Sequence, residues 1–279
     1  MSDSEHEGGG VPLLEPLSPS ASPEPSSNKR KRDADGKEES KRAAKRKKAK
    51  KPKDIEDDAL DVEKGVNQAI AHMDAQLMAD HIAQRTKRFH SDLSLMELED
   101  LHVPATAIVD TTGWDKPRDL ENLPAFLERF SRNRRGKGKK KLSEADEEKG
   151  RPHTLVVAPA GLRAADLTRA LRKFQTKEAM VAKLFAKHIK LREAIEMVNK
   201  TRMGIGVGTP QRIMDLLEDG SLASAGLERI VVDASHIDQK KRGILDMKET
   251  EAPLVRLLCR SDLKERFGSG DGKIELLFY

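Results

Sequence analysis

The 279-residue chain is 35% charged and only 3% aromatic, a composition too polar for one compact domain throughout. Its single cysteine, Cys259, excludes an intrachain disulfide and a zinc site built from cysteines, which is typical of proteins in a reducing compartment. No apolar run approaches the roughly 20 residues that cross a bilayer, and the N-terminus lacks the apolar core of a signal peptide. We therefore expect a soluble protein with no membrane partner and with part of its chain unfolded or extended.

The net charge of +5 comes from the N-terminal tail. Residues 1–28 contain five acids and no lysine or arginine, whereas residues 29–53 contain fourteen basic residues against four acids. Proline, serine and glutamate dominate the first stretch and leave too little apolar surface to offset the entropy of ordering the chain. Residues 1–53 are therefore predicted to form a disordered tail.

Two basic blocks in this tail are separated by a short polar spacer. The blocks are Lys29, Arg30, Lys31 and Arg32, and Lys45, Arg46, Lys47 and Lys48. This arrangement is typical of a bipartite nuclear-import signal, and runs of this density also bind polyanions such as RNA by releasing counterions. The alternative is a charged tail that only solvates the protein.

Residues 54–124 are predicted to form a helical extension. Apolar residues recur there at intervals of three or four and predict one amphipathic helix, with a stripe of Val62, Val66, Ile70, Met73 and Leu77. This stripe either packs on the chain's own globular domain or docks into a larger assembly. In the turn that follows, we expect Trp114 to be a packing anchor rather than a base-stacking platform, because no other aromatic residue lies close to it in sequence.

Residues 125–150 are predicted to be a charged, mobile linker. A third basic block lies here and comprises Arg132, Arg134, Arg135, Lys137, Lys139, Lys140 and Lys141. Within it, Arg134 and Arg135 are candidate contacts for the phosphates of RNA.

Residues 151–279 alternate between strand and helix patterns. The expected strands are 154–158, 180–185, 203–207, 229–233 and 273–278, with helices over 162–174, 191–199 and 211–217 between them. Short apolar runs of this kind are buried on both faces of a parallel sheet. The glycines that alternate along residues 204–208 are interpreted as allowing close packing. The predicted fold class is α/β, with a single parallel sheet, flanking helices and right-handed crossovers.

Two motifs follow strands of this sheet, at the carboxyl ends where ligands gather in α/β proteins. Thr209-Pro210-Gln211-Arg212 follows the third strand, and Asp233-Ala234-Ser235-His236 follows the fourth. They resemble the Thr-Pro-Gly-Arg and Asp-Glu-Ala-Asp motifs of DEAD-box RNA helicases. Residues 151–279 are therefore predicted to be a degenerate RecA-like lobe, similar to the N-terminal lobe of those helicases.

The resemblance also indicates candidate RNA contacts. Residues 159–164 occupy the place of the helicase Pro-Thr-Arg-Glu-Leu-Ala motif, and Arg163 lies two positions past the arginine of that motif. Thr209 offers a hydroxyl and free amides at a helix N-terminus, which suit a phosphate group. Arg163, Thr209 and Arg212 are therefore the candidates on the lobe.

The residues that would hydrolyse ATP on such a lobe are missing from the sequence. None of the four Gly-Lys pairs is followed by serine or threonine, so the phosphate loop Gly-x-x-x-x-Gly-Lys-Ser/Thr is absent. A charged insertion precedes Thr154, and we expect no strand–loop–helix unit there. Asp233 retains one magnesium-binding carboxylate, but Ala234 replaces the residue that would activate water, and a metal role for the lone His236 is disfavoured. We also expect no second lobe.

Three segments resemble the Cms-one type family: Phe185–Leu191, Ile205–Ile213 and Ile230–His236. Its members are nucleolar, DEAD-box-derived subunits of the 90S pre-ribosome, also called the small-subunit processome. The resemblance covers residues 55–279 and implies a non-catalytic pseudo-helicase in early 40S ribosome biogenesis and rRNA processing. It further implies pre-ribosomal RNA and processome proteins as partners, a location in the nucleus and nucleolus, and no cofactor, metal or small-molecule substrate.

Two other functions stay open on the residues alone. One is an RNA-dependent ATPase or helicase with an unrecognised nucleotide site. The other is a nuclear protein-interaction module that makes no contact with RNA. ATP binding would distinguish the first from a scaffold, and crosslinking to RNA in cells would distinguish the second.

Overall fold

The computed structural model describes residues 59–131, 140–185, 189–268 and 272–279, all within one compact unit, Lys50–Tyr279. Both basic blocks of the tail lie outside these residues, and so do Arg134 and Arg135. Within the described ranges, no helix is long and apolar enough to span a membrane.

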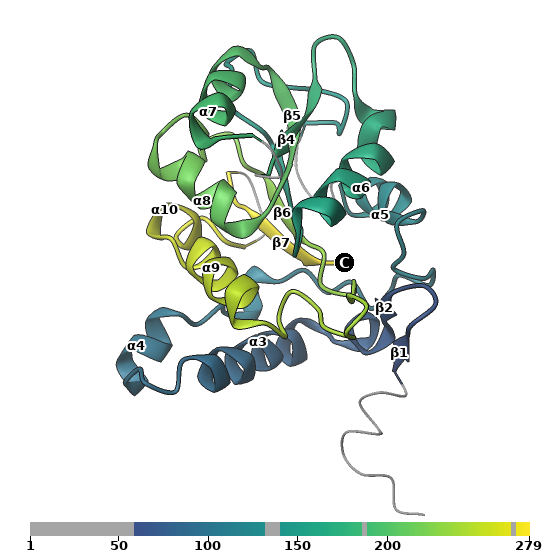
Figure 1. Ribbon diagram of the computed structural model, residues 1–279, viewed down its shortest axis with the longest axis vertical. Coiled ribbons are helices and arrows are strands. Elements are labelled where there is room, and N and C mark those ends of the chain that lie inside the picture. The colour runs from purple at the N-terminus through teal and green to yellow at the C-terminus, as the bar shows by residue number, and fades with distance from the viewer. Residues whose placement is uncertain (1–58, 132–139, 186–188, 269–271) are drawn as a thin grey trace, which may run out of the picture. The chain divides into compact units, whose positions relative to one another are not determined.

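Five parallel strands form the central sheet, in the spatial order β4-β5-β3-β6-β7 (Figure 1). The strands are β3 (Thr154–Val157), β4 (Met180–Leu184), β5 (Met203–Gly208), β6 (Arg229–Val232) and β7 (Glu275–Phe278). All five predicted strands are confirmed, as is the α/β class with a single parallel sheet and flanking helices. Their ends differ from the predicted ends by two residues or fewer.

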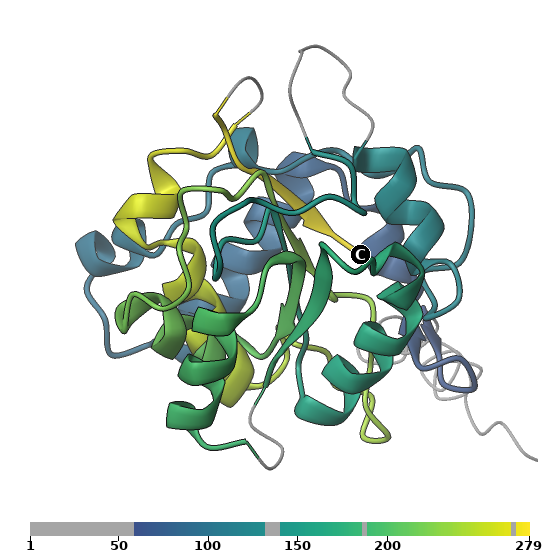
Figure 2. The ribbon, with the colours of Figure 1, turned by 90° about the horizontal axis from the view of Figure 1, so that it is seen from above.

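Helices cover both faces of the sheet because its strands are apolar on both sides. Leu155 and Val157 of β3 pack into one core cluster, while Val156 and Ala158 pack into a second. The second cluster is covered by α5 (Leu123–Ser131) and α6 (Gly161–Leu171), and the first by α7 (Leu191–Lys200), α8 (Pro210–Glu218), α9 (Lys248–Leu258) and α10 (Ser261–Lys264). Figure 2 shows these two groups of helices on opposite sides of the strands.

The glycines of β5 let neighbouring segments approach its backbone closely, as predicted. A Cβ atom on Gly208 would lie 2.2 Å from the carbonyl oxygen of Leu184, and one on Gly204 would lie 2.3 Å from that of Glu144. Real side chains do not tolerate such distances, so these positions require glycine. The close packing fixes β5 against β4 and against the segment that leads into β3.

The prediction of one helix with a stripe from Val62 to Leu77 is wrong. The chain instead forms a hairpin of β1 (Leu60–Asp61) and β2 (Val66–Asn67), a 3-10 turn η1 (Gln68–His72), and then the helix α3 (Ala75–Phe89). Gly65 has a φ of 63°, a left-handed conformation that ends any helix and suits a hairpin turn. Asp74 caps α3 by accepting a hydrogen bond from the Leu77 amide, so the helix begins after most of the supposed stripe.

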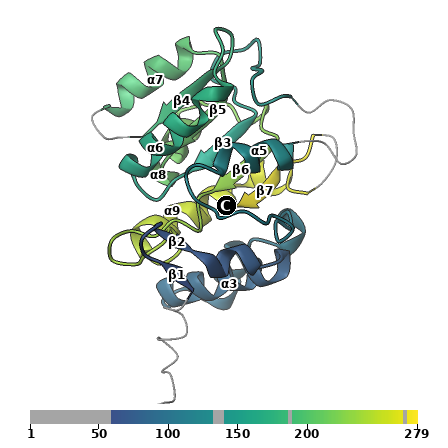
Figure 3. The ribbon, with the colours of Figure 1, turned by 90° about the vertical axis from the view of Figure 1, so that its right-hand side faces the viewer.

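Only some of the apolar side chains between Val62 and Leu77 are buried against the rest of the domain. Val66 and Ile70 are buried, whereas Val62 and Leu77 are 55% and 54% exposed. Ile70 and Met73 belong to the core cluster beneath α9, so this part of the extension packs on the chain's own domain. Figure 3 shows the extension, in blue, below the sheet and beside α9. Two short helical segments complete it, α4 (Leu95–Asp100) and η2 (Ala105–Ala107).

The prediction of a mobile linker over residues 125–150 is wrong at both ends. Its first residues belong to α5, where Phe126 is fully buried in the core. Its last residues are also placed, because Leu142 is buried and the Lys140 ammonium lies 2.5 Å from the Asp146 carboxylate. Residues 140–150 contain no helix or strand, so the correction at this end concerns packing and not secondary structure.

Trp114 is a packing anchor, as predicted. Its ring is 7% exposed and meets Phe126 edge to face, with ring centroids 5.5 Å apart and an interplanar angle of 86°. This geometry is the favoured one for aromatic pairs. Trp114 therefore holds the loop before α5 against that helix.

Candidate functional site at the carboxyl edge of the sheet

The residues that follow β3, β5, β6 and β7 form the carboxyl edge of the sheet, where α/β proteins usually bind ligands. At its centre, Arg163 of α6 binds Asp233, the residue after β6. The guanidinium Nε and Nη2 donate to the two carboxylate oxygens at 2.8 and 3.1 Å. The side chain of Asp233 is 1% exposed and that of Arg163 is 12% exposed. Both acceptor oxygens of this carboxylate are thus engaged by one cation.

The charge of Asp233 compensates the cost of burying the Arg163 guanidinium. Burial alone would lower the pKa of Arg163, but the charge and hydrogen bonds of Asp233 outweigh that effect and raise it. Bidentate guanidinium–carboxylate pairs are among the strongest hydrogen-bonded contacts in proteins. The carboxylate that the sequence left as a magnesium ligand therefore has an internal cation as its partner, and Arg163 points toward Asp233.

The backbone after Asp233 is fixed on two sides. The amides of Ala234 and Ser235 both donate to the carbonyl oxygen of Tyr279, at 2.8 and 2.7 Å. On the other side, the Ser235 carbonyl accepts a hydrogen bond of 2.7 Å from the Asn67 amide of β2. His236 forms an antiparallel bridge with Val66. The hairpin of the extension is therefore joined to the loop that follows β6.

His236 is the last residue of the degenerate second motif and lies half-buried beneath this hairpin. Burial lowers its pKa, and the positive charge of Arg163 acts in the same direction, against the opposite influence of Asp233. The side chain is therefore held toward its neutral form. Among the described residues, no group of three His, Cys, Asp or Glu side chains is arranged to hold a metal ion.

An extended segment, a loop and a helix do precede β3, contrary to the prediction from sequence. Ile108 bridges Leu276 in parallel, and the Val109 amide donates to the Leu276 carbonyl at 2.8 Å, so this segment extends the sheet beyond β7. The loop of residues 110–122 and then α5 follow it. The sequence did not reveal this unit because the extended segment is short and lies between two prolines, Pro104 and Pro117.

Arg118 fills the inside of that loop. Its Nη1 donates to the Phe278 carbonyl at 2.5 Å, and its Nη2 donates to the carbonyl and hydroxyl oxygens of Thr111 at 3.2 and 2.9 Å. A longer contact of 3.4 Å reaches the Ala71 carbonyl of η1. The side chain is 1% exposed, and burial lowers its pKa to about 10. Arg118 thus joins β7, the loop and the extension.

Sequence reasoning missed Arg118. No motif surrounds it, and its partners are main-chain oxygens that no sequence pattern identifies. The signal that could have found it is its place in an otherwise polar loop directly before an apolar helix. Arg118 nevertheless occupies the space beside the carboxyl end of β7, where it donates to the Phe278 carbonyl.

Thr209 and Arg212 occupy different environments. Thr209 is the half-buried N-cap of α8, and its side chain makes no capping hydrogen bond, while Pro210 occupies the first turn. Arg212 is buried, and its Nη1 donates to the Ile189 carbonyl at 3.2 Å. The structure therefore leaves Thr209 at the carboxyl edge and directs Arg212 into polar contacts within the lobe, with Ile189 and, at 4.0 Å, with the Asp215 carboxylate. Whether either residue contacts RNA stays a prediction.

Comparison with known proteins decides the family. A family model described as "CMS1: U3-containing 90S pre-ribosomal complex subunit" matches residues 24–279. The chain belongs to this family. The resemblance to the Cms-one type family seen in the sequence is thereby confirmed.

Relatives in several fungi and animals support the assignment to this family. Protein CMS1 of Chaetomium thermophilum is 57% identical over 84% of this chain and 92% of its own length. Protein cms1 of Schizosaccharomyces pombe is 30% identical over 72% of this chain and 69% of its own length. Protein CMSS1 of Homo sapiens is 30% identical over 65% and 61% of the two chains.

Two solved structures are similar to this family member. One is a DEAD box protein from Methanococcus jannaschii, with 16% identity and a TM-score of 0.32, covering 49% of this chain and 33% of that chain. Another is dbp5 of S. cerevisiae, with 19% identity and a TM-score of 0.35, covering 59% and 42% of the two chains.

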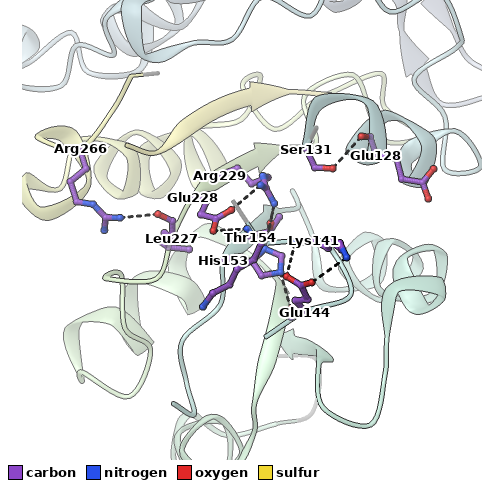
Figure 4. A network of polar contacts seen from close by, with 11 residues as sticks. Glu128, Ser131, Lys141, Glu144, His153, Thr154, Leu227, Glu228, Arg229 and Arg266 are labelled. Atoms are coloured by element: carbon purple, nitrogen blue, oxygen red, sulfur yellow. Dashed lines mark hydrogen bonds and ion pairs between the residues drawn. The ribbon is translucent and has the colours of Figure 1, made fainter. Parts of the chain in front are cut away.

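A second buried polar cluster lies at the opposite end of the sheet in this family member (Figure 4). The His153 ring lies 3.0 Å from the Glu144 carbonyl through Nε2 and 2.7 Å from the Thr154 hydroxyl through Nδ1. Because a carbonyl only accepts, Nε2 carries the proton and Nδ1 accepts from Thr154. Arg229 in turn donates to the Thr154 hydroxyl at 3.0 Å and pairs with Glu228 at 2.9 Å. Protonation of Nδ1 would break this chain of hydrogen bonds.

The cluster predicts an acid-sensitive fold. Burial, aided by the charge of Arg229, lowers the pKa of His153 to about 3 from an ordinary 6.5. Between these two pKa values only the unfolded chain binds the proton, so stability is complete above pH 6.5 and falls as the pH decreases toward 3. The contribution of this group is about 1.4 kcal/mol per pH unit. Urea denaturation of the parent and of His153→Gln across this range should show the shallower pH dependence in the variant, and equal slopes would contradict the account.

Proposed function

We propose that this protein is a non-catalytic subunit of the 90S pre-ribosome, in which a helicase-like lobe acts as a scaffold during early 40S ribosome biogenesis and rRNA processing. Membership of a family described as a subunit of the 90S pre-ribosomal complex supports the assignment to this particle. The observation that carries the non-catalytic part is the bidentate contact of Arg163 with Asp233. A carboxylate neutralised in this way is not available to organise a divalent cation and a phosphate.

Two further features of the carboxyl edge support a scaffold. The hairpin of β1 and β2 lies on the loop after Asp233, and Arg118 fills the loop that follows the Ile108 segment. In open α/β sheets this edge is where a ligand binds. Here the chain's own extension occupies its β6 and β7 side, so the fold favours a fixed frame over a site that opens and closes.

RNA contact is part of the proposal and is assigned to the basic blocks of the sequence and to one residue of the lobe. The candidates are Lys29, Arg30, Lys31, Arg32, Lys45, Arg46, Lys47, Lys48, Arg134 and Arg135, with Thr209 as the candidate on the lobe. Nuclear import by the two tail blocks would bring the protein to the nucleus and nucleolus, where 90S particles assemble. Partners are then pre-ribosomal RNA and processome proteins.

Co-sedimentation tests the proposed function. In growing cells that express the full chain with an affinity tag, we expect the protein to migrate with particles that contain 90S pre-ribosomal RNA on a sucrose gradient. Depletion of the protein should lower the yield of 40S subunits relative to 60S subunits. Migration only at the top of the gradient, with unchanged 40S levels, would refute the proposal.

Charge reversal in the tail tests its RNA contact. Replacing Lys45, Arg46, Lys47 and Lys48 by glutamate should weaken binding to any single-stranded RNA, because phosphate contacts carry no base information. The slope of log affinity against log salt should fall by up to about 3, from about 0.7 per lost contact. Thr209→Ala is the comparison, since it removes one hydroxyl and no charge and should leave the slope unchanged. An unaltered slope in the glutamate variant would exclude the tail as the main contact.

A further inference from the structure

An apolar groove lies between α3 and α4, remote from the carboxyl edge. It has a volume of about 400 Å³. It is lined on the α4 side by Leu95, Leu98, Glu99, Leu101 and His102, and on the α3 side by Ala83, Thr86 and Lys87. Figure 1 shows α4 beyond the C-terminal end of α3, at the end of the domain away from the C-terminus. A molecule bound there would leave the carboxyl edge free of contact.

Two large apolar side chains beside this groove face solvent. Leu95 is 81% exposed and Met96 is 78% exposed. The helix that carries them is held rigidly, because the Ser94 hydroxyl and amide form a capping box with Glu97 and the Lys264 ammonium donates to the Asp100 carbonyl at 3.0 Å. Adjacent exposed apolar residues next to a groove are typical of a surface that binds another molecule.

The rim of the groove is acidic on the α4 side. Residues 91–101 contain four acids and no lysine or arginine. Glu97 is committed to the capping box, whereas the exposed carboxylates of Asp92, Glu99 and Asp100 form no ion pair with any described residue. Lys87 lines the opposite, α3 side of the groove, so it is the α4 side of the rim that attracts basic groups and repels anionic ones.

We propose that this groove, with Leu95 and Met96, binds an amphipathic helix of a protein partner whose apolar face is flanked by lysine or arginine. An apolar helix face inserted into a groove is a common mode of recognition, and the acidic rim selects the basic flanks. The inference rests on the proposed function in one respect, because a subunit of a large particle requires protein contacts.

Other occupants fit the groove less well. The chain's own basic tail over residues 29–53 contains no leucine, isoleucine, valine, phenylalanine or methionine, so it could pair with the rim but could not fill the apolar floor. A second copy of the chain, docked through the same face, would bring acidic rims together. RNA phosphates would meet like-charge repulsion along the α4 side of the rim, and they carry no apolar face to fill the leucine-lined floor.

Peptide binding to the full chain tests the inference. The probe is a fluorescein-labelled helical peptide of about 18 residues, built only from leucine on one face and lysine elsewhere. We expect the double variant Leu95→Glu, Met96→Glu to bind it at least about tenfold more weakly than the parent. The variant should keep the parent's unfolding midpoint, because both side chains are exposed. Leu77→Glu, at an exposed position of α3 outside the groove, is the matched control and should bind like the parent.

Charge specificity provides the second arm. A leucine–glutamate peptide of the same pattern should bind the parent more weakly than the lysine peptide does. Glu99→Lys with Asp100→Lys should reverse that preference. Equal binding of the lysine peptide by the parent and the Leu95/Met96 variant would overturn the inference, as would displacement of the peptide by single-stranded RNA or by self-association of the chain.

The two proposals fail separately. If the parent protein does not co-sediment with 90S particles, the proposed function is lost whatever the peptide shows. If the parent co-sediments and the Leu95/Met96 variant co-sediments equally well, with peptide binding unaffected, only the docking groove is refuted.

Discussion

Replacing Arg163 by alanine is expected to lower the free energy of unfolding by about 3–5 kcal/mol. The substitution leaves the carboxylate of Asp233, which is 1% exposed, without its cation and without both of its guanidinium hydrogen bonds. A buried charge that loses its partner is far more costly than an exposed one, because water cannot replace the lost contact. Urea denaturation of the full chain measures the change directly.

A second ion pair on the same helix provides the control. Arg169 pairs with Asp166 on α6, and their side chains are 64% and 38% exposed. Arg169→Ala should therefore cost no more than about 1 kcal/mol. If Arg163→Ala and Arg169→Ala destabilise the protein equally, the buried pair contributes no more to stability than an exposed pair, and this part of the account is wrong.

A matched double replacement separates stability from pairing. Arg163→Met with Asp233→Leu removes both charges and keeps apolar volume, and such exchanges are often neutral or stabilising by about 1–4 kcal/mol. We expect the double variant to be much more stable than Arg163→Ala. That result would show that the cost of the single change arises from the unpaired carboxylate rather than from lost packing around α6.

Replacing Arg118 by alanine is expected to have an effect of similar size, about 3–5 kcal/mol of unfolding free energy. The change leaves a cavity and removes the guanidinium donor from the Phe278 and Thr111 carbonyls, which keep the Thr111 hydroxyl and the Trp114 amide, respectively. It also removes the contact with Ala71, which joins the extension to the loop. Chemical denaturation measures the loss, and hydrogen exchange should localise it to the loop before α5.

An exposed cation of the same loop gives the comparison. Lys116→Ala, two residues away, should change the free energy of unfolding by no more than about 0.5 kcal/mol. In Arg118→Ala, the Val109 and Trp114 amides should exchange faster, since their hydrogen bonds hold the edge segment and the loop. Uniformly faster exchange across the whole domain, with no excess at these amides, would contradict a local anchoring role.

The sheet could be predicted from the sequence because each strand carries its own signal. Runs such as Thr154–Val157 and Arg229–Val232 are largely apolar, short and bounded by turn residues. This pattern is typical of parallel strands that are covered by helices on both faces of the sheet. The helices between them follow from the same alternation. The motifs at Thr209 and Asp233 were placed correctly at the carboxyl edge, because that edge is fixed by the order of strands and helices.

The extension and the site could not be predicted in the same way. Apolar residues spaced three or four apart, as from Val62 to Leu77, can also occur by chance in a hairpin followed by a helix. The left-handed conformation of Gly65 and the capping of α3 by Asp74 favour the hairpin and the later helix start over one continuous helix. The Arg163–Asp233 contact joins residues seventy positions apart. Sequence places both at one edge of the sheet, but only the three-dimensional arrangement selects which cation meets the carboxylate.

Calorimetric titration of the full chain with ATP and magnesium, with and without RNA, tests most directly whether the carboxyl edge is filled by the chain itself. A frame whose Asp233 is held by Arg163 predicts no measurable heat of nucleotide binding and no release of phosphate under either condition. Micromolar affinity for ATP accompanied by RNA-stimulated turnover would contradict the account.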